Sequence, residues 1–539
     1  MRYGFKRLIA EYEENKNSNV HDNKQVICVK RMKRYYQEND HYSLAYATIT
    51  LADYFRIKRN FVNTNALLNF ASNVVKDFGS KDETNTLIHA LYECTLLTLK
   101  EFSAVAAKRL HQANNDVTVN QLIAIDQHNK KYLHEIRAKI FHKLQHTNKE
   151  HSIEINALYK YCTQYMEKFF INIVNESTDI LGKHNVKMSF VYLGSHAKME
   201  ATPFSDVEFF ILVDQENDVY SKEITKLILL MILNLGETVL GAMGIKVYDK
   251  SGKQYNLDIY DTITNMGYMF DSNIDLACKT PLGKKIMVNG KEIVSFRLFG
   301  KPDAIASIAS TVGYQKYIYF PQLIRLNRLI KDLDTSNGVL YETFQQLLST
   351  SDFNIGTYAQ TILKNDIEKY ITFLDKSLTA NTIQHQQHFS RALNVLLDNL
   401  LTILSPIENI DSYQKLSKLR EYSIISVKQE QELESILNSV LYTKMSQYFH
   451  NGQQKINLSI ATDYYKSARD AQQKIRDFLS SIYQQILYRE TVLLKKEASL
   501  ANQVALNFFS PLKKPAKKRH PSVITKKASK YYVPPKSTK

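Results

Sequence analysis

The sequence predicts an α+β fold in which a small mixed sheet lies between two all-helical regions. Two observations support this prediction. Residues 190–214 read as an apolar strand, a Gly-Ser turn, a polar loop and a second apolar strand. On both sides of this stretch, apolar residues recur at helical spacing. With 539 residues, of which 44% are apolar, the chain is long enough for about three domains, each with its own core.

The first predicted unit is a helical domain over residues 1–127. From His41 onward, apolar residues fall on successive helix faces, and Gly79 is the residue type that commonly ends a helix. The two helices between Ser43 and Asp77 resemble one tetratricopeptide unit. Arrays of such units generally need about three repeats or more, so a generic helical domain is the stronger interpretation.

The second predicted unit covers residues 128–300 and contains the sheet. Two long helices precede the first strand, a very apolar helix follows the second strand, and two further strands come next. These elements are expected at residues 128–144, 153–180, 220–240, 245–248 and 255–260.

The third predicted unit is a helical domain over residues 301–510, followed by a disordered tail over residues 511–539. One helix of this domain is expected to end before Ser405-Pro406, because a proline disfavours the helical conformation of the residue that precedes it. The formal net charge is +16, and the tail alone carries ten Lys and Arg residues and no acid. The rest of the chain is only mildly basic, which argues against a nucleic-acid surface over the whole protein.

The basic tail has several possible partners. Its cluster Lys513–Pro521 resembles a nuclear-localisation signal, and it could bind an import receptor, an anionic membrane or a nucleic acid. A solvated basic end that aids solubility is an equally good interpretation. The four cysteines form no CxxC motif and are expected to be idle thiols. The longest aliphatic run, Leu227–Leu233, is too short to cross a bilayer, and no secretory signal is visible, so we expect a soluble chain.

The chemistry of the chain is expected in the strand-turn-strand stretch. Asp206 and Glu208 stand two residues apart on a strand, so their side chains point to the same face. Two carboxylates placed together suit a hard divalent cation, Mg²⁺ or Mn²⁺. Twelve residues before Asp206, the turn Gly194-Ser195 offers N–H groups and a hydroxyl to a phosphate. Together these features describe a nucleoside triphosphate site, whereas a solvated strand end is the simpler alternative.

The motif resembles a known family. Gly194-Ser195-His196-Ala197-Lys198-Met199-Glu200, followed by Pro203-Phe204-Ser205-Asp206-Val207-Glu208-Phe209, is similar to the nucleotidyltransferase domain of the protein-PII uridylyltransferase type. That type belongs to the DNA polymerase β-like nucleotidyltransferase superfamily. The similarity extends to residues 132–137, 234–238 and 277–283 and covers roughly residues 130–300, in the manner of a subfamily found in large multidomain and bacterial effector-like proteins.

The resemblance implies roles for particular residues. Asp206 and Glu208 would hold the metal with a third carboxylate, which is expected at Asp258, with Asp261 and Asp271 as rivals. The nucleotide would bind at Gly194, Ser195, Lys198 and Ser205. Two departures stand out: Lys198 replaces the usual Arg and loses bidentate phosphate geometry, and Glu208 replaces the usual Asp. A salt-bridge or helix-start role for Glu200, and simple exposure of Lys198, are the alternatives.

The implied activity is Mg²⁺-dependent transfer of UMP or AMP from a nucleoside triphosphate to a hydroxyl, on a protein acceptor, with release of pyrophosphate. One alternative is a degenerate nucleotidyltransferase fold that binds a nuclear or acidic partner, which would hold if Asp258 pointed to solvent. An RNA-tailing enzyme is less favoured, because no basic and aromatic interleaving is visible in the sequence. The expected location is the bacterial cytoplasm or, after export, the cytosol or nucleus of a host cell.

Overall fold

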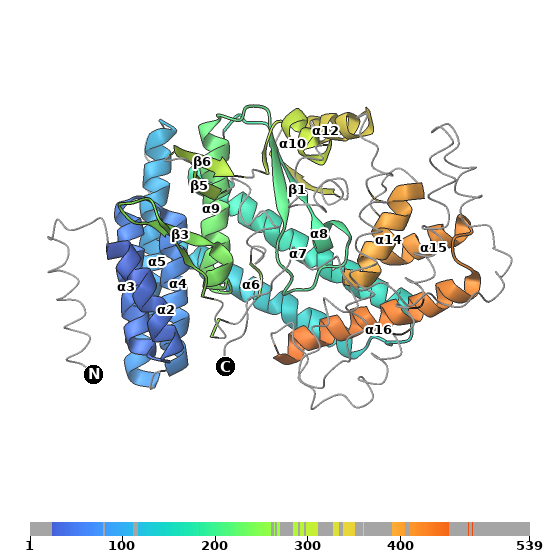
Figure 1. Cartoon of the computed structure of the whole chain (residues 1–539), viewed down its shortest axis with the longest axis horizontal. Helices are drawn as coiled ribbons and strands as arrows, with labels where there is room; N and C mark the ends of the chain where they lie inside the picture. The colour runs from blue at the N-terminus through green and yellow to red at the C-terminus, as the bar shows by residue number, and fades with distance from the viewer. Residues whose placement is uncertain are drawn as a thin grey trace, which may run out of the picture.

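The structure is a computed structural model of the whole chain. It describes residues 24–78, 81–111, 117–182, 184–259, 263–264, 267–269, 284–288, 291–295, 298–310, 327–333, 338–350, 359, 391–404, 410–451, 473 and 477. Helices dominate, and a small sheet lies in the middle, between helices of the N-terminal region at one end and helices of the C-terminal region at the other (Figure 1). This arrangement confirms the predicted α+β class. The predicted tail lies outside the described residues.

From residue 24 onward, the first four helices that the structure describes pack together. They are α2 (Lys24–Gln37), α3 (His41–Ile57), α4 (Phe61–Phe78) and α5 (Lys81–Arg109). The side chain of Asp40 caps α3 by accepting a hydrogen bond from the Ser43 N–H at 3.1 Å. Residues predicted to share one face of α3, among them Leu44 and Leu51, are buried. The predicted pair of helices is therefore confirmed as α3 and α4.

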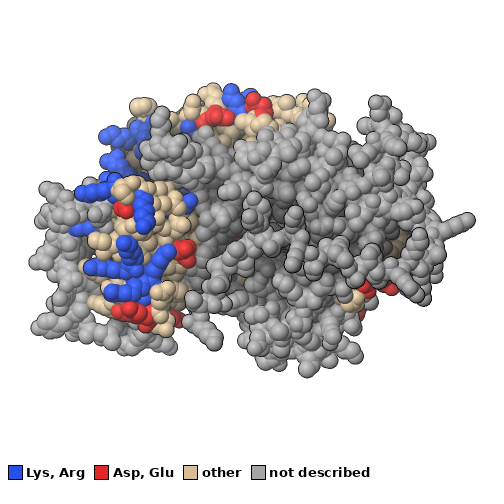
Figure 2. Space-filling view, viewed as in Figure 1, with Lys and Arg blue, Asp and Glu red and all other residues tan. Residues whose placement is uncertain are grey.

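Basic side chains gather on the N-terminal end. The helix α2 contains no acidic residue and carries Lys30, Arg31 and Arg34 on exposed positions. Figure 2 shows Lys and Arg side chains concentrated over this end of the face in view. The charge outside the tail is thus unevenly distributed, which the overall count of residues did not indicate.

Two long helices connect the N-terminal end to the sheet. They are α6 (Val119–Gln145) and α7 (Ser152–Leu181). A capping box starts α6: the Thr118 hydroxyl accepts from the Gln121 N–H, and the Gln121 side chain accepts from the Thr118 N–H at 2.8 Å. On α7, Phe170 packs against the rings of Phe190 and Phe209, with centroids 6.0 and 5.0 Å away. The helix α7 therefore covers one face of the sheet.

The central sheet has four strands in the order β7-β2-β1-β8. Its strands are β1 (Met188–Tyr192), β2 (Phe209–Val213), β7 (Phe299–Gly300) and β8 (Arg328–Asp332). β1 pairs antiparallel with both β2 and β8, whereas β2 pairs parallel with β7, so the sheet is mixed as predicted. Because β8 comes from residues 328–332, the sheet draws on chain beyond the boundary expected at residue 300.

Alternate side chains of β1 and β2 pack on opposite faces of the sheet. Phe190 and Phe209 lie in the large core with α7, and Val191 and Phe210 lie in a second core. The second core is completed by α10 (Pro302–Ser310) and α12 (Val339–Thr350), where the Phe344 ring meets Phe210 at 5.2 Å. Each strand is thus buried on both faces, which explains its continuous apolar sequence.

Two antiparallel hairpins stand apart from the central sheet. Both hairpins follow α9 (Val219–Asn234) and the short 3-10 helix η1 (Leu240–Met243) in the chain. The first hairpin pairs β3 (Ile245–Tyr248) with β4 (Gln254–Leu257). The second pairs β5 (Lys284–Val288) with β6 (Lys291–Ser295). The predicted strands near residues 245–260 are therefore confirmed as β3 and β4. Neither hairpin is hydrogen-bonded to β1 or β2 as a sheet neighbour.

Three helices are described in the C-terminal region. They are α14 (Arg391–Leu404), α15 (Ser412–Glu421) and α16 (Val427–Asn451). α14 ends at Leu404, directly before Ser405-Pro406, as predicted. α16 packs on α7, where the Tyr159 hydroxyl donates to the Leu441 carbonyl at 2.8 Å. Among the described helices, none combines the length and apolar character that a membrane span requires.

Candidate active site

The Gly-Ser turn lies at the end of β1. The Leu193 N–H donates to the Glu208 carbonyl at 2.9 Å, which continues the pairing of β1 with β2 by one residue. The chain then turns into the single helical turn α8 (Gly194–Ala197). Gly194 has a φ of +58°, a left-handed conformation that favours glycine. A Cβ at this position would lie 1.8 Å from Oε2 of Glu208. Gly194 is therefore required both by its backbone conformation and by the close approach of Glu208.

Ser195 offers hydrogen-bond donors at the surface of this turn. Its side chain is partly exposed. Within the described part of the chain, the N–H groups of Gly194 and Ser195 and the Ser195 hydroxyl make no hydrogen bond. These donors are therefore available to an anion, and binding of a phosphate at this turn stays a prediction.

Asp206 and Glu208 lie in the extended segment directly before β2, rather than on the strand itself as the sequence predicted. Exposure alternates along this segment: Ser205 and Val207 are buried, whereas Asp206 and Glu208 are partly exposed. The alternation indicates that the two carboxylates lie on one side of the chain. Val207 stands between the two carboxylates, and its N–H donates to the Met269 carbonyl at 2.7 Å. This hydrogen bond fixes the backbone between Asp206 and Glu208.

We expected Asp258 to join this pair, and the structure places it elsewhere. Asp258 follows β4, its side chain is half exposed, and its Oδ1 lies 2.5 Å from the Nζ of Lys33 on α2. The hairpin of β3 and β4 is not hydrogen-bonded to the central sheet, and the ion pair of Asp258 is with a residue of the N-terminal helices. Among the described residues, no three His, Cys, Asp or Glu side chains gather as a metal site. The rivals Asp261 and Asp271 lie outside the described residues.

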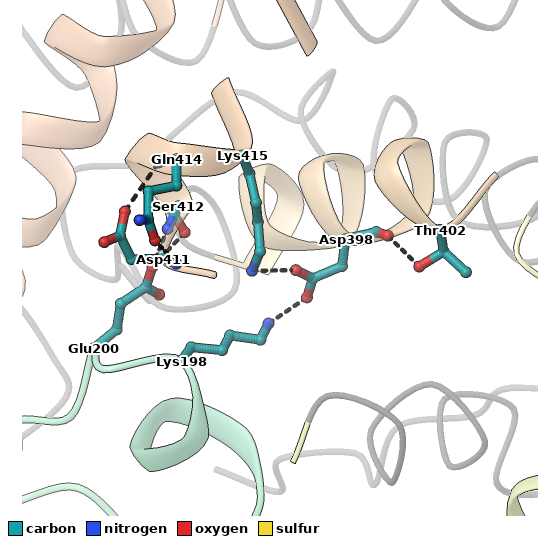
Figure 3. Close-up of polar contacts among 8 residues, drawn as sticks. All are labelled: Lys198, Glu200, Asp398, Thr402, Asp411, Ser412, Gln414 and Lys415. Atoms are coloured by element: carbon teal, nitrogen blue, oxygen red, sulfur yellow. Dashed lines mark hydrogen bonds and ion pairs between the residues drawn. The ribbon is translucent and has the colours of Figure 1, made fainter. Parts of the chain in front are cut away.

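Lys198 faces the C-terminal helices. Its Nζ forms an ion pair with Oδ2 of Asp398 on α14, and Nζ of Lys415 on α15 lies 2.8 Å from the other oxygen of that carboxylate (Figure 3). Burial by itself would lower the pKa of Lys198, but the charges of Asp398 and Glu200 outweigh it and raise that pKa. The residue predicted to bind phosphate is thus held as a cation by an aspartate from another region of the chain.

Glu200 is buried at the N-terminus of α15. Its Oε1 accepts hydrogen bonds from the N–H of Ser412, at 3.1 Å, and from the Ser412 hydroxyl (Figure 3). A carboxylate is favoured at this position, because the first N–H groups of a helix lack partners within the helix. Lys198 and Glu200, two residues apart in the motif, therefore both connect the Gly-Ser turn to α14 and α15.

Ser205 shapes the loop between the turn and the carboxylates. Its Oγ accepts from the Thr202 N–H at 2.8 Å, and its own N–H donates to the Thr202 carbonyl at 3.1 Å. The side chain is buried. The structure thus places this predicted nucleotide-binding residue inside the loop, where it holds the loop that leads to Asp206.

An arginine on α6 braces the same loop. The Nη2 of Arg137 donates to Oε2 of Glu237 at 2.8 Å and to the Pro203 carbonyl at 3.1 Å. Its guanidinium lies over the ring of Phe204, 4.2 Å from the centroid. Glu237 also accepts from the Tyr268 N–H at 2.6 Å. The two outlying segments that carried the family resemblance, 132–137 and 234–238, therefore meet at this brace.

His196 lies in the core beneath the turn. Its ring stacks on Tyr192, with centroids 4.8 Å apart, and is fully buried. Burial, together with the charges of Arg328 and Lys444, lowers the pKa of His196 to about 3. This histidine is consequently neutral near pH 7 and is a packing residue of the turn.

Lys444 on α16 lies near the site and was not among the residues predicted from the sequence. It is partly exposed and makes no ion pair or hydrogen bond with a described residue. Burial lowers the pKa of Lys444 below its ordinary value; the charge of Lys198 acts in the same direction, and the charges of Glu200 and Asp206 offset the shift only in part. No local signal marks this lysine, because only the packing of α16 brings it toward the loop that carries Asp206.

The site combines a mixed sheet with a Gly-Ser turn that lies close to Glu208, and Asp206 supplies a second carboxylate two residues before Glu208. Together these features define a nucleotidyltransferase-like domain. Comparison with known families agrees, since residues 139–238 match the family model described as "Putative nucleotidyltransferase DUF294". The match includes Gly194, Asp206, Glu208 and Glu237, and ends before Asp258 and Lys444. A search of curated proteins found no match.

Proposed function

We propose that the chain is a divalent-metal-dependent nucleotidyltransferase that moves UMP or AMP from a nucleoside triphosphate to a hydroxyl on a protein. The observation that carries the proposal is the approach of Glu208 to Gly194, which joins the carboxylates to the anion-binding turn. In the reaction, the acceptor oxygen attacks the α-phosphorus, and the bond from that phosphorus to the bridging oxygen breaks. Pyrophosphate leaves, and the hydroxyl proton passes to water.

The residues fit a Mg²⁺ ion. Asp206 and Glu208 are partly exposed oxygen donors in the extended segment before β2, and Mg²⁺ in nucleotide sites is commonly held by one or two carboxylates together with substrate phosphates and water. When bound, the ion neutralises phosphate charge and polarises the acceptor hydroxyl. The donors of Gly194 and Ser195 would bind phosphate oxygens, and the brace of Arg137 would keep Asp206 in place.

Labelling with nucleotides tests the proposal. The full chain would be incubated with α-labelled ATP or UTP, Mg²⁺ or Mn²⁺, and a cell lysate. We expect a labelled protein with the natural chain, no label with the double variant Asp206→Ala, Glu208→Ala, and no label in a chelator. Glu432→Ala, which removes an exposed carboxylate on α16, should label like the natural chain. Equal labelling by the double variant would refute the proposal.

A second candidate function has one observation in its favour. Asp258 is held by Lys33, so no third described carboxylate accompanies Asp206 and Glu208. A fold without turnover would bind a nucleoside triphosphate and metal, measurable by calorimetry, yet label no acceptor under any condition. A labelled RNA product in the same assay would instead identify a tailing enzyme.

A further inference from the structure

The C-terminal helix α16 reaches the loop of the candidate active site. Two contacts define its position: the Tyr159 hydroxyl bonds to the Leu441 carbonyl, and the ring of Phe449 meets the ring of Phe204 at a centroid distance of 5.4 Å. Phe204 stands two residues before Asp206 in the same loop. Lys444 lies between these two contacts on the helix, so the packing of α16 places it at the level of that loop.

Several carboxylates near α14, α15 and Lys198 already have partners other than Lys444. Asp398 is shared by Lys198 and Lys415, and Glu200 is held by Ser412 (Figure 3). Asp411, the N-cap of α15, lies 2.7 Å from the Nζ of Lys160. Lys444 takes part in none of these pairs, although it lies in the electrostatic field of Glu200 and Asp206.

Within the part of the chain that the structure describes, Lys444 is near Glu200 and Asp206 but has no hydrogen-bonded or ion-paired anion, so a further anion could bind its ammonium group. A partly buried cation without a hydrogen-bonded partner loses hydration and gains little in return. A phosphate chain would supply several oxygens, and lysine is a common point-charge ligand of phosphates. The anion-binding turn of Gly194 and Ser195 precedes the same loop, so an anion spanning the turn and α16 would meet donors at both ends.

We propose that the ammonium group of Lys444 binds the phosphate chain of the nucleoside triphosphate, so that the C-terminal helix α16 completes the site. This inference rests on the proposed function and adds a binding residue to it. The C-terminal helices then do more than cover the nucleotidyltransferase-like domain, because a site built from residues 139–238 alone would lack this contact.

Equilibrium binding to the full chain tests the assignment. The probes are Mg²⁺–ATP, Mg²⁺–UTP and inorganic tripolyphosphate. We expect Lys444→Ala to weaken binding of all three by about tenfold or more, the loss typical of a charge-assisted contact. Lys444→Arg should recover most of the affinity. The matched control Lys428→Ala removes an exposed lysine from the same helix and should bind like the natural chain.

A second measurement needs no substitution at Lys444. An amine-acylating reagent, read by mass spectrometry, should modify Lys444 several-fold more slowly when Mg²⁺–ATP is present, while Lys428 reacts at the same rate. Unchanged modification of Lys444, or unchanged affinity of Lys444→Ala, overturns the assignment.

The failure of this inference is distinguishable from the failure of the proposed function. If the natural chain binds none of the probes, the nucleotidyltransferase function itself is contradicted, and the role of Lys444 falls with it. If the natural chain binds, the Asp206→Ala, Glu208→Ala variant does not, and Lys444→Ala binds normally, then only the role of Lys444 is wrong.

Discussion

At the scale of single residues, Gly194 shows how closely the backbone and the carboxylates are matched. Its left-handed φ is one demand on this position, and the space occupied by Glu208 Oε2, 1.8 Å from where a Cβ would lie, is a separate one. Gly252 meets only the first demand, because its φ is +81° and nothing lies within 4 Å of a Cβ there. Comparing alanine substitutions at the two glycines therefore distinguishes the effect of backbone strain from the effect of displacing Glu208.

We predict that Gly194→Ala lowers nucleotide labelling at least about tenfold, because the new methyl group displaces the Glu208 carboxylate. Gly252→Ala should leave labelling unchanged. Both variants should lose about 1 kcal/mol of unfolding free energy from the strained backbone, because the Glu208 side chain is flexible and can move away from the new methyl group at little cost in stability. Labelling assays and chemical denaturation measure the two effects. Equal labelling by the two variants would contradict a role for the close approach.

His196 makes the stability of the protein depend on pH. Its pKa is about 3 in the folded chain, against an ordinary value of 6.5. Between these values the unfolded chain binds a proton and the folded chain does not, so stability falls as the pH drops below about 6.5. We predict a loss of roughly 1 kcal/mol from this group between about pH 7.5 and pH 5.5. The variant His196→Phe should lose less over that range in denaturation experiments, and His134→Phe, at an exposed position, should behave like the natural chain.

Local sequence patterns predict some of these residues and leave others undetectable. The pairing of Asp206 with Glu208 follows from the two-residue period of a strand, and the turn at Gly194 follows from the residue type. Asp258 has the same kind of local signal, yet its surroundings are set by the distant Lys33. Lys444 has no local signal at all. Its place depends on how α16 packs, which no spacing within a single element records.

At the scale of elements, a segment before β1 and a segment after β2 meet at the contact between Arg137 and Glu237. Arg137, on α6, donates hydrogen bonds to Glu237, which follows α9, and to the Pro203 carbonyl. These bonds connect the two helices to the loop before Asp206. Strands β1 and β2 and the helices α6, α7 and α9 were all visible as apolar patterns. Strand β8 was not, because its sequence is short and mixed, and its pairing with β1 is a long-range contact.

We predict that Arg137→Lys destabilises the chain by roughly 2 kcal/mol, since a lysine cannot make the paired hydrogen bonds to Glu237 or stack on Phe204. Nucleotide labelling should fall as well, because the loop before Asp206 loses its brace. The comparison variant is Arg34→Lys, at an exposed pair with Glu38 on α2, which should change stability by less than about 0.5 kcal/mol. Denaturation midpoints that agree between the two variants would count against the brace.

At the scale of the whole molecule, the C-terminal helices are tied to the candidate site by charges from its own motif. Lys198 and Glu200 come from the Gly-Ser segment, and their partners Asp398 and Ser412 come from α14 and α15. The sequence predicted a separate helical domain after residue 300. The sheet instead includes β8 from beyond that point, and the motif itself docks the helices that follow. Helical periodicity predicts that such helices exist, whereas their docking depends on charges that are paired only in three dimensions.

Substitution of Asp398 tests this connection. Burial alone would raise the pKa of Asp398, but Lys198 and Lys415 hold it below its usual range, so the carboxylate is charged in the folded chain. In Asp398→Asn, both lysines lose their counter-charge inside the protein, and we predict a loss of roughly 3 kcal/mol of unfolding free energy. Asp303→Asn, at an exposed position on α10, should cost less than about 0.5 kcal/mol.

The same variant should also affect the nucleotide. With Asp398 neutral, Lys198 is free to turn toward other anions and the turn at Gly194 loses its anchor on α14, so we expect weaker binding of Mg²⁺–ATP at a temperature where the variant is still folded. Asp398→Glu keeps the charge and should retain most of the binding. Asp398 lies outside residues 139–238, which the family model matches, and contacts them through Lys198. The effect would therefore arise only if the C-terminal helices and the nucleotidyltransferase-like domain work as one unit. Unchanged nucleotide affinity in a folded Asp398→Asn variant would show instead that the two regions are merely packed together.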